Sequence, residues 1–99
     1  MGREDIDQGY KGMFSYNFPE IAGNYSLLEQ TAKIMEEAGE AHSAASRTDK
    51  LECLVEIMDI VQSCETALRK FGFSTVTTAA DYVMEKNYLR GYYGEPEYD

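Results

Sequence analysis

The sequence carries little positive charge and no long apolar run, and each absence excludes a class of protein. Nine Lys and Arg residues stand against eighteen Asp and Glu residues, which gives a formal net charge of −9. A nucleic-acid polymer or an anionic membrane binds a basic surface, so we expect neither as a partner. No apolar run approaches the about 18 residues that a transmembrane helix needs, so no membrane span is expected.

The first residues also lack the features of a targeting signal. They contain no apolar core of the secretory kind, and Ile6 stands where a myristoylation motif requires Ser or Thr. The only two cysteines, Cys53 and Cys64, fall in one predicted helix, which would hold them about 16 Å apart and so prevent a disulfide. We therefore expect reduced thiols and a cytoplasmic protein.

The chain has 99 residues, enough for one domain, and 43% of them are hydrophobic, as in a folded protein. We expect an irregular N-terminal arm over 1–24, a helical domain over 25–94 and a frayed tail over 95–99. In the arm, Phe14, Tyr16 and Phe18 alternate with polar residues. This pattern indicates a short extended piece, packed either on the helical body or on a partner chain.

The first predicted helix begins near 24–26, because Ser26 and Glu29 have the spacing of a capping box, and it ends near 46–47. Its apolar residues recur at three- and four-residue spacing, as a narrow stripe rich in small side chains. Small side chains let a second helix approach closely. The stripe consists of Leu27, Thr31, Ile34, Ala38, Ala41 and Ala45.

The second predicted helix begins after Asp49 as N-cap and runs to about Phe71, with Gly72 as its C-terminal stop. It is apolar around most of its circumference, so it has to be covered on most sides, and this predicts a homo-oligomer. A third helix should run from Ser74 or Thr75 to about Leu89. One face of it carries Val76, Ala80, Val83 and Asn87.

The predicted fold is therefore all-α: an antiparallel helical hairpin plus a third helix, assembled into an oligomeric helical bundle. Both helices of the hairpin carry acids three residues apart, which share a helix face. Counted from the connecting turn, Glu40 and Glu56 lie at equal depth, and so do Glu37 and Asp59. Four carboxylates brought together repel one another unless a cation lies between them.

Hard divalent cations such as Mg²⁺, or Mn²⁺ as a substitute, prefer oxygen ligands. No His or Cys accompanies the acids, which argues against zinc or a di-iron site. The alternative for each acid pair taken alone is a solvated helix face. The single histidine, His42, is expected to be structural.

Three segments resemble the motifs of the MazG-like nucleotide pyrophosphohydrolases, which belong to the all-α NTP pyrophosphatases. The first is residues 33–41 (KIMEEAGEA), the second is 56–59 (EIMD), and the third is the basic stretch 86–90 (KNYLR). The resemblance covers roughly residues 26–93. It implies a homodimer or homotetramer that hydrolyses a nucleoside triphosphate to the monophosphate and pyrophosphate with Mg²⁺.

The resemblance also implies roles for individual residues. The metal ligands would be Glu37, Glu40, Glu56 and Asp59. Glu36 would be the catalytic candidate that supports or orients the attacking water. Lys86 and Arg90 share a helix face that suits phosphate, although a solvated basic patch at a helix end is the alternative. Asn87 would read a sugar or base, or satisfy a neighbouring backbone group.

The chain also departs from the motifs of this family. Asp59 is followed by residues 60–62 (IVQ), without the Tyr-His of the phosphoribosyl-ATP enzymes, and the absence of Trp removes the aromatic motifs of the dCTP-type members. The base preference therefore does not carry over. Two other functions stay open: a non-enzymatic oligomeric helical interaction protein with a structural or vestigial metal site, and a nucleotide sensor without turnover.

Overall fold

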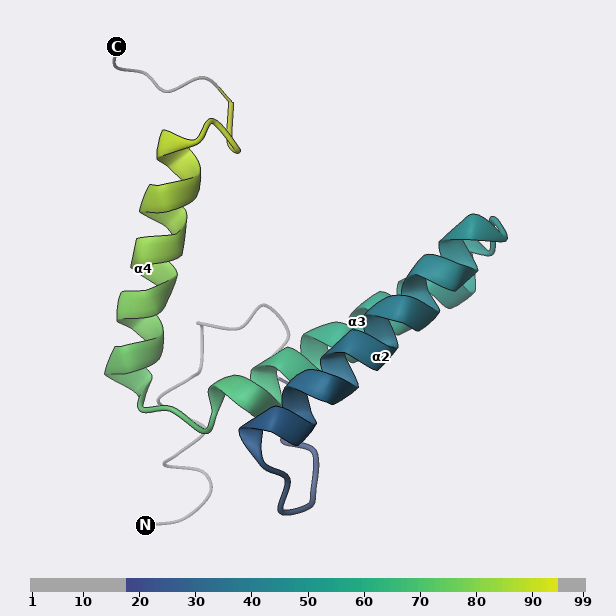
Figure 1. The fold of residues 1–99 in the computed structure, drawn as a ribbon, viewed down its shortest axis with the longest axis horizontal. Helices are drawn as coiled ribbons and strands as arrows, with labels where there is room; N and C mark the ends of the chain where they lie inside the picture. The colour runs from purple at the N-terminus through teal and green to yellow at the C-terminus, as the bar shows by residue number, and fades with distance from the viewer. Residues whose placement is uncertain (1–17, 95–99) are drawn as a thin grey trace.

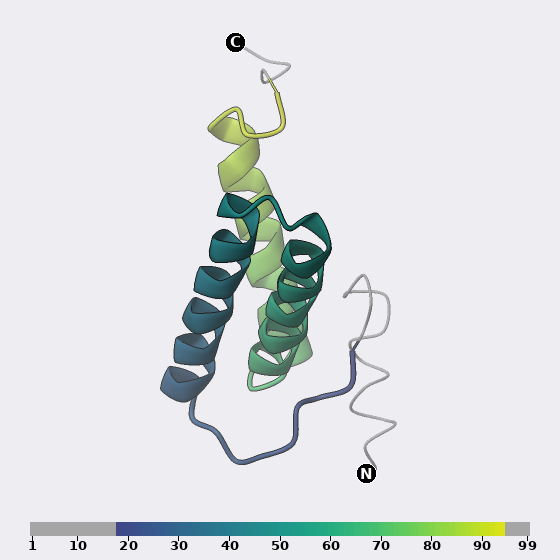
Figure 2. The same cartoon turned by 90° about the vertical axis from the view of Figure 1, so that its right-hand side faces the viewer.

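The computed structural model describes residues 18–94, which form three helices and no strand, so the all-α prediction is confirmed. The helices are α2 (Leu27–Ser46), α3 (Lys50–Leu68) and α4 (Phe73–Leu89). Helices α2 and α3 lie side by side as an antiparallel hairpin, and α4 stands apart from them (Figures 1 and 2). The predictions for Phe14, Tyr16 and the tail 95–99 lie outside the described residues.

Helix α2 begins as its capping box predicts. The Ser26 hydroxyl accepts a 3.1 Å hydrogen bond from the Glu29 amide, and the Glu29 carboxylate accepts a 2.8 Å bond from the Ser26 amide. Two of the amides that a helix start leaves unpaired are thereby satisfied. The Ser26 cap therefore determines where α2 starts.

The connection to α3 is a three-residue turn, with Asp49 as the expected N-cap accepting from the Glu52 amide at 3.1 Å. Thr48 takes a left-handed conformation with φ of 59°, which a branched side chain rarely adopts. Helix α3 ends at Leu68, three residues before the predicted end. Gly72 is not its C-terminal stop, because Gly72 is extended and is the N-cap of α4.

The face that α2 turns toward α3 differs from the predicted stripe. The buried residues of α2 are Gln30, Glu37, Ala41 and Ala44. Four members of the predicted stripe are exposed instead: Leu27, Thr31, Ala38 and Ala45. The helix is rotated so that Glu37 enters the interface, where the Ser63 hydroxyl donates to it. A buried carboxylate needs such a donor, and this contact overrides the simple count of apolar residues.

Residues 18–25 form a strap along the C-terminal end of α3. The Phe18 amide donates to Glu65 Oε1 at 2.6 Å, and the Ile21 amide donates to Thr66 Oγ1 at 3.1 Å. Farther along, the Lys70 ammonium donates to the Tyr25 carbonyl. The described end of the arm therefore lies on the helical body, one of the two placements that the sequence left open.

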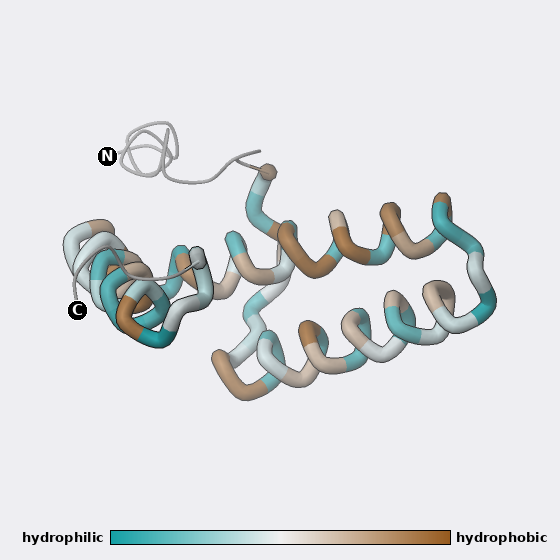
Figure 3. Tube along the Cα trace, turned by 90° about the horizontal axis from the view of Figure 1, so that it is seen from above, coloured by the Kyte–Doolittle hydropathy of each residue, from teal (hydrophilic) through white to brown (hydrophobic). Residues whose placement is uncertain are grey.

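Apolar burial within the described residues is small. The buried hydrophobic residues are Ala41, Ala44, Ala67 and Val76, whereas seventeen large hydrophobic side chains are exposed. Figure 3 shows hydrophobic residues along α3 that no other described segment overlies. No helix within residues 18–94 is both long and apolar enough to cross a membrane. Most of the large apolar side chains of the described chain are therefore exposed, and a core of three alanines and one valine contributes little to stability.

Candidate metal and phosphate site

Glu40 on α2 and Glu56 on α3 are close enough across the hairpin for Glu40 to affect the pKa of Glu56, and they lie at the equal depth that the sequence predicts. A hydrogen bond to Glu40 raises the pKa of Glu56, and partial burial and the negative charges of Glu40, Asp59 and Glu52 raise it further. Each of these causes disfavours ionised Glu56. A proton or a cation between the two carboxyl groups would reduce their repulsion.

One oxygen of Glu56, Oε2, is buried and has no hydrogen-bond partner within the described part of the chain. A buried carboxylate oxygen without a donor is costly. Carboxylate oxygens are the ligands that Mg²⁺ and Mn²⁺ prefer. The donor chemistry at this point of the hairpin therefore fits a hard divalent cation.

Glu37 is placed differently from the expectation that it faces Asp59. Its side chain is buried, and its Oε1 accepts a 2.6 Å hydrogen bond from Ser63, one turn beyond Asp59 on α3. Asp59 itself is half-buried and lies close enough to Glu56 to raise its pKa. A hydroxyl donor relieves a buried carboxylate, whereas a second carboxylate repels it, and this explains the shift along α3.

The four predicted ligands do not converge in this structure. Between residues 18 and 94, no three His, Cys, Asp or Glu side chains lie close enough together to hold a metal ion. Glu40 and Glu56 are in contact, whereas Glu37 is engaged by Ser63. Glu36 is exposed and forms an ion pair with Lys33 at 3.8 Å.

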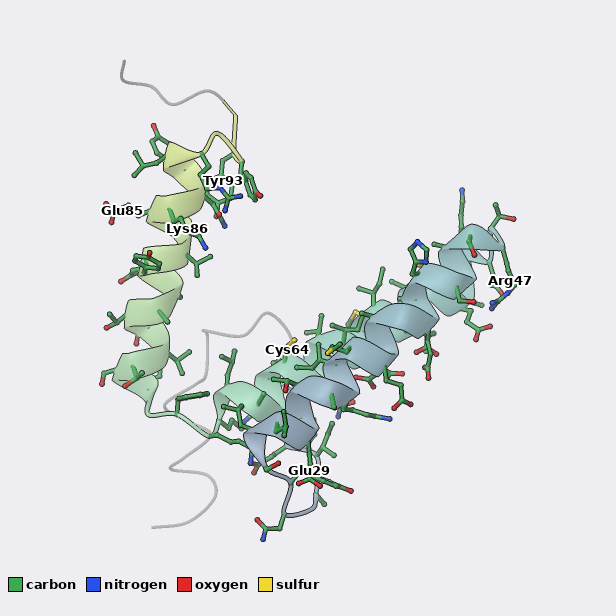
Figure 4. All side chains as sticks on the ribbon, in the orientation of Figure 1. Glu29, Arg47, Cys64, Glu85, Lys86 and Tyr93 are labelled. Atoms are coloured by element: carbon green, nitrogen blue, oxygen red, sulfur yellow. The ribbon has the colours of Figure 1, made fainter. Side chains whose placement is uncertain are left out.

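The predicted phosphate-binding residues lie on α4, away from the carboxylates of their own hairpin. Figure 4 shows Lys86 on the side of α4 that faces the open angle between α4 and the hairpin, and Glu85 on the opposite side. Arg90 donates to the Tyr92 hydroxyl at 2.7 Å and stacks over its ring at 4.4 Å. Asn87 is half-buried, and its backbone carbonyl accepts a 2.9 Å hydrogen bond from the backbone amide of Tyr92.

Sequence reasoning missed two features of this region. One is the role of Ser63, for which the available signal was its position on the same helix face as Glu52, Glu56 and Asp59. The other is a cleft of about 380 Å³ between the strap and α2, which no periodicity indicates because the strap is irregular. The cleft is lined by Ile21, Tyr25, Glu29, Gln30, Ala32, Lys33 and Glu36.

No family model, no curated protein and no solved structure matches this chain.

Proposed function

We propose that this protein is a Mg²⁺-dependent nucleoside triphosphate pyrophosphohydrolase, acting as a homodimer or homotetramer in the cytoplasm. The contact between Glu40 and Glu56, with Glu56 Oε2 buried and lacking a donor, is the observation that supports it most directly. Such a pair gains from a divalent cation, and a cation is what a triphosphate needs in a chain of net charge −9. The MazG-like motifs supply the reaction type.

Glu40, Glu56 and Asp59 would hold the metal, and Glu37 would join them by exchanging its bond to Ser63 for the ion. When bound, Mg²⁺ neutralises charge on the phosphates and lowers the pKa of a bound water. Glu36 lies four residues before Glu40 on the same face of α2 and borders the cleft under the strap. From there its carboxylate can accept a proton from the attacking water.

Lys86 and Arg90 would bind phosphate oxygens, and Asn87 would contact the sugar or base. An ammonium group acts as a point charge, whereas a guanidinium group can hold two oxygens at once. Arg90 donates to the Tyr92 hydroxyl and stacks over its ring, so to bind a phosphate it would exchange this hydrogen bond, at a modest net cost.

The test is an assay of pyrophosphate release by purified protein with Mg²⁺, or Mn²⁺, and a panel of canonical and modified triphosphates. We expect turnover of at least one triphosphate, abolished by Glu56→Gln and retained by Glu85→Gln, a matched change on the outer side of α4 (Figure 4). Absence of pyrophosphate across the whole panel with both metals would overturn the proposal.

One observation favours a second function, a non-enzymatic interaction protein. Seventeen large hydrophobic side chains are exposed in the described chain, and large exposed apolar patches mark interaction sites. A ligand that binds only the native state raises its melting temperature with concentration. No rise at millimolar Mg²⁺ with unaltered protein would favour the interaction protein, and a rise that Glu40→Gln abolishes would favour the metal site.

A further inference from the structure

The strap crosses from the C-terminal end of α3 to the start of α2 and is held there through its backbone (Figure 2). The Phe18 amide donates to Glu65, and the Arg69 guanidinium donates to the Phe18 carbonyl at 2.9 Å. The Ile21 amide and the Tyr25 carbonyl are likewise bonded by side chains from residues 65–70. The side chains of Ile21 and Tyr25 take no part in these bonds, and both line the cleft against α2.

Gln30 is the buried polar residue of this cleft. It is 6% exposed and lies on the side of α2 that faces α3, in line with Glu37 and Ala41. Within residues 18–94, its side-chain amide forms no hydrogen bond. A buried amide without a partner is unfavourable, so a bound molecule that supplies the partner gains from it. Because an amide both donates and accepts, Gln30 indicates a ligand that carries an amide of its own.

The exposed edge of the cleft carries one exchangeable ion pair. Lys33 and Glu36 lie 3.8 Å apart, with side chains that are 53% and 61% exposed. Such a pair contributes little energy, so both partners are available for charges on a ligand. Glu29, the third charged residue of the cleft, accepts from the Ser26 amide at 2.8 Å and caps the helix. The cleft therefore offers one ammonium and one carboxylate, which together match a zwitterion.

The spacing of these groups limits the size of the ligand. Gln30 lies one turn before Lys33 on α2, and the Cβ atoms of such a pair are about 5–6 Å apart. In glutamine, and in a dipeptide, the amide carbon lies within about 5 Å of the carboxylate carbon. A cleft of about 380 Å³ is near the lower end of the range for ligand sites. A small molecule, rather than a folded partner, therefore fits it.

We propose that the cleft between the strap and α2 binds a small zwitterion that carries an amide group, as glutamine and dipeptides do. The ligand amide pairs with the Gln30 amide, its carboxylate with Lys33 and its ammonium with Glu36. The side chains of Ile21 and Tyr25 cover its carbon atoms. This site goes beyond the proposed function and does not depend on it, because the ligand is neither a nucleotide nor a metal ion.

Isothermal titration calorimetry of the full chain, without nucleotide or metal, tests the site. The probes are L-glutamine and glycylglycine, and we expect saturable binding of at least one of them below about 10 mM. The tighter probe shows whether the ligand is a free amino acid or a dipeptide. L-Methionine lacks the amide and butyramide lacks the charges, so each should bind at least about tenfold more weakly than the tighter probe. No saturable binding of either probe, or equally tight binding of L-methionine or butyramide, overturns the proposal.

A variant at Gln30 separates recognition from folding. Gln30→Met keeps the length of the side chain and removes its amide. We expect binding of the tighter probe to weaken at least about tenfold, whereas the melting temperature should not fall, because the amide has no partner to lose. Binding that is retained by Gln30→Met overturns the proposal.

A variant at the exposed edge tests the site without touching a buried group. Lys33→Met should weaken binding at least about tenfold, because the ligand carboxylate loses its ammonium partner. Lys50→Met is the matched control, since Lys50 is exposed at the other end of the hairpin, and it should bind as wild type does. Binding unchanged in Lys33→Met, or weakened equally in Lys50→Met, overturns the proposal.

Discussion

The Ser63 hydroxyl donates a 2.6 Å hydrogen bond to Glu37 Oε1 inside the contact between α2 and α3. Ser63 is fully buried and Glu37 is 8% exposed, so water does not replace either partner. The bond stabilises the rotation of α2 in which Gln30, Glu37, Ala41 and Ala44 are buried.

Ser63→Ala should lower the free energy of unfolding by about 1–3 kcal/mol, because it leaves a buried carboxylate without its donor. Urea denaturation followed by circular dichroism measures the change. Ser46→Ala is the matched control, since the Ser46 hydroxyl bonds only the Ser43 carbonyl at an exposed site. A loss no larger than that of Ser46→Ala would contradict a structural role for the Ser63 bond.

Glu56 should make stability depend on pH. Because its pKa is raised in the folded state, its protonated form contributes stability that is complete below the unfolded pKa of about 4.3. That contribution is lost as the pH rises through the folded pKa. In EDTA at neutral pH, Glu56→Gln should therefore unfold at higher urea concentration than wild type, and the difference should shrink below pH about 4.3.

Addition of Mg²⁺ extends this measurement. If Glu56 is a metal ligand, millimolar Mg²⁺ should stabilise the wild type at neutral pH and leave Glu56→Gln unchanged. Glu85→Gln serves as the control for loss of one negative charge, and it should behave as wild type does. If Glu56→Gln were more stable to urea than wild type by the same amount at every pH, the raised pKa of Glu56 would be refuted.

Thr48 should be a site of stored backbone strain. A left-handed conformation costs a residue with a Cβ atom about 1–2 kcal/mol, and Thr48 adopts φ of 59° in the turn. Thr48→Asn should raise the free energy of unfolding by about 0.5–1 kcal/mol, since Asn tolerates this region. The melting temperature in differential scanning calorimetry checks it, with Thr31→Asn on the exposed surface of α2 as a control that should change stability little, because Asn and Thr have similar helix propensities.

The strap should loosen when its acceptor on α3 is removed. Thr66→Val keeps the shape of the side chain but takes away the oxygen that the Ile21 amide bonds at 3.1 Å. Amide hydrogen exchange at Ile21 should accelerate several-fold, whereas exchange at Phe18, whose acceptor is Glu65, should change less. Equal protection of Ile21 in both proteins would show that other contacts hold the strap.

Local chemistry determined most of the secondary structure. The Ser26–Glu29 capping box and the Asp49 cap act over a few residues, so the starts of α2 and α3 follow from the sequence. The glycines after Leu89 act in the same way at the end of α4. The pairing of Glu40 with Glu56 follows too, because a short turn makes depth along the hairpin a matter of counting.

Tertiary contacts determined the rotation of α2 and the direction of α4, which residue spacing along the chain does not predict. The rotation of α2 buries Glu37 beside Ser63 and leaves Ala38 exposed, and the spacing of the apolar residues predicts neither. The direction of α4 depends on how the short connection after Leu68 turns, with Gly72 as a cap for the next helix. Periodicity shows that one face of a helix is apolar, but only the packed structure shows which element that face contacts. Many rotations of α2 about its axis bury a similar apolar area, whereas few of them give the buried carboxylate of Glu37 a hydrogen-bond donor.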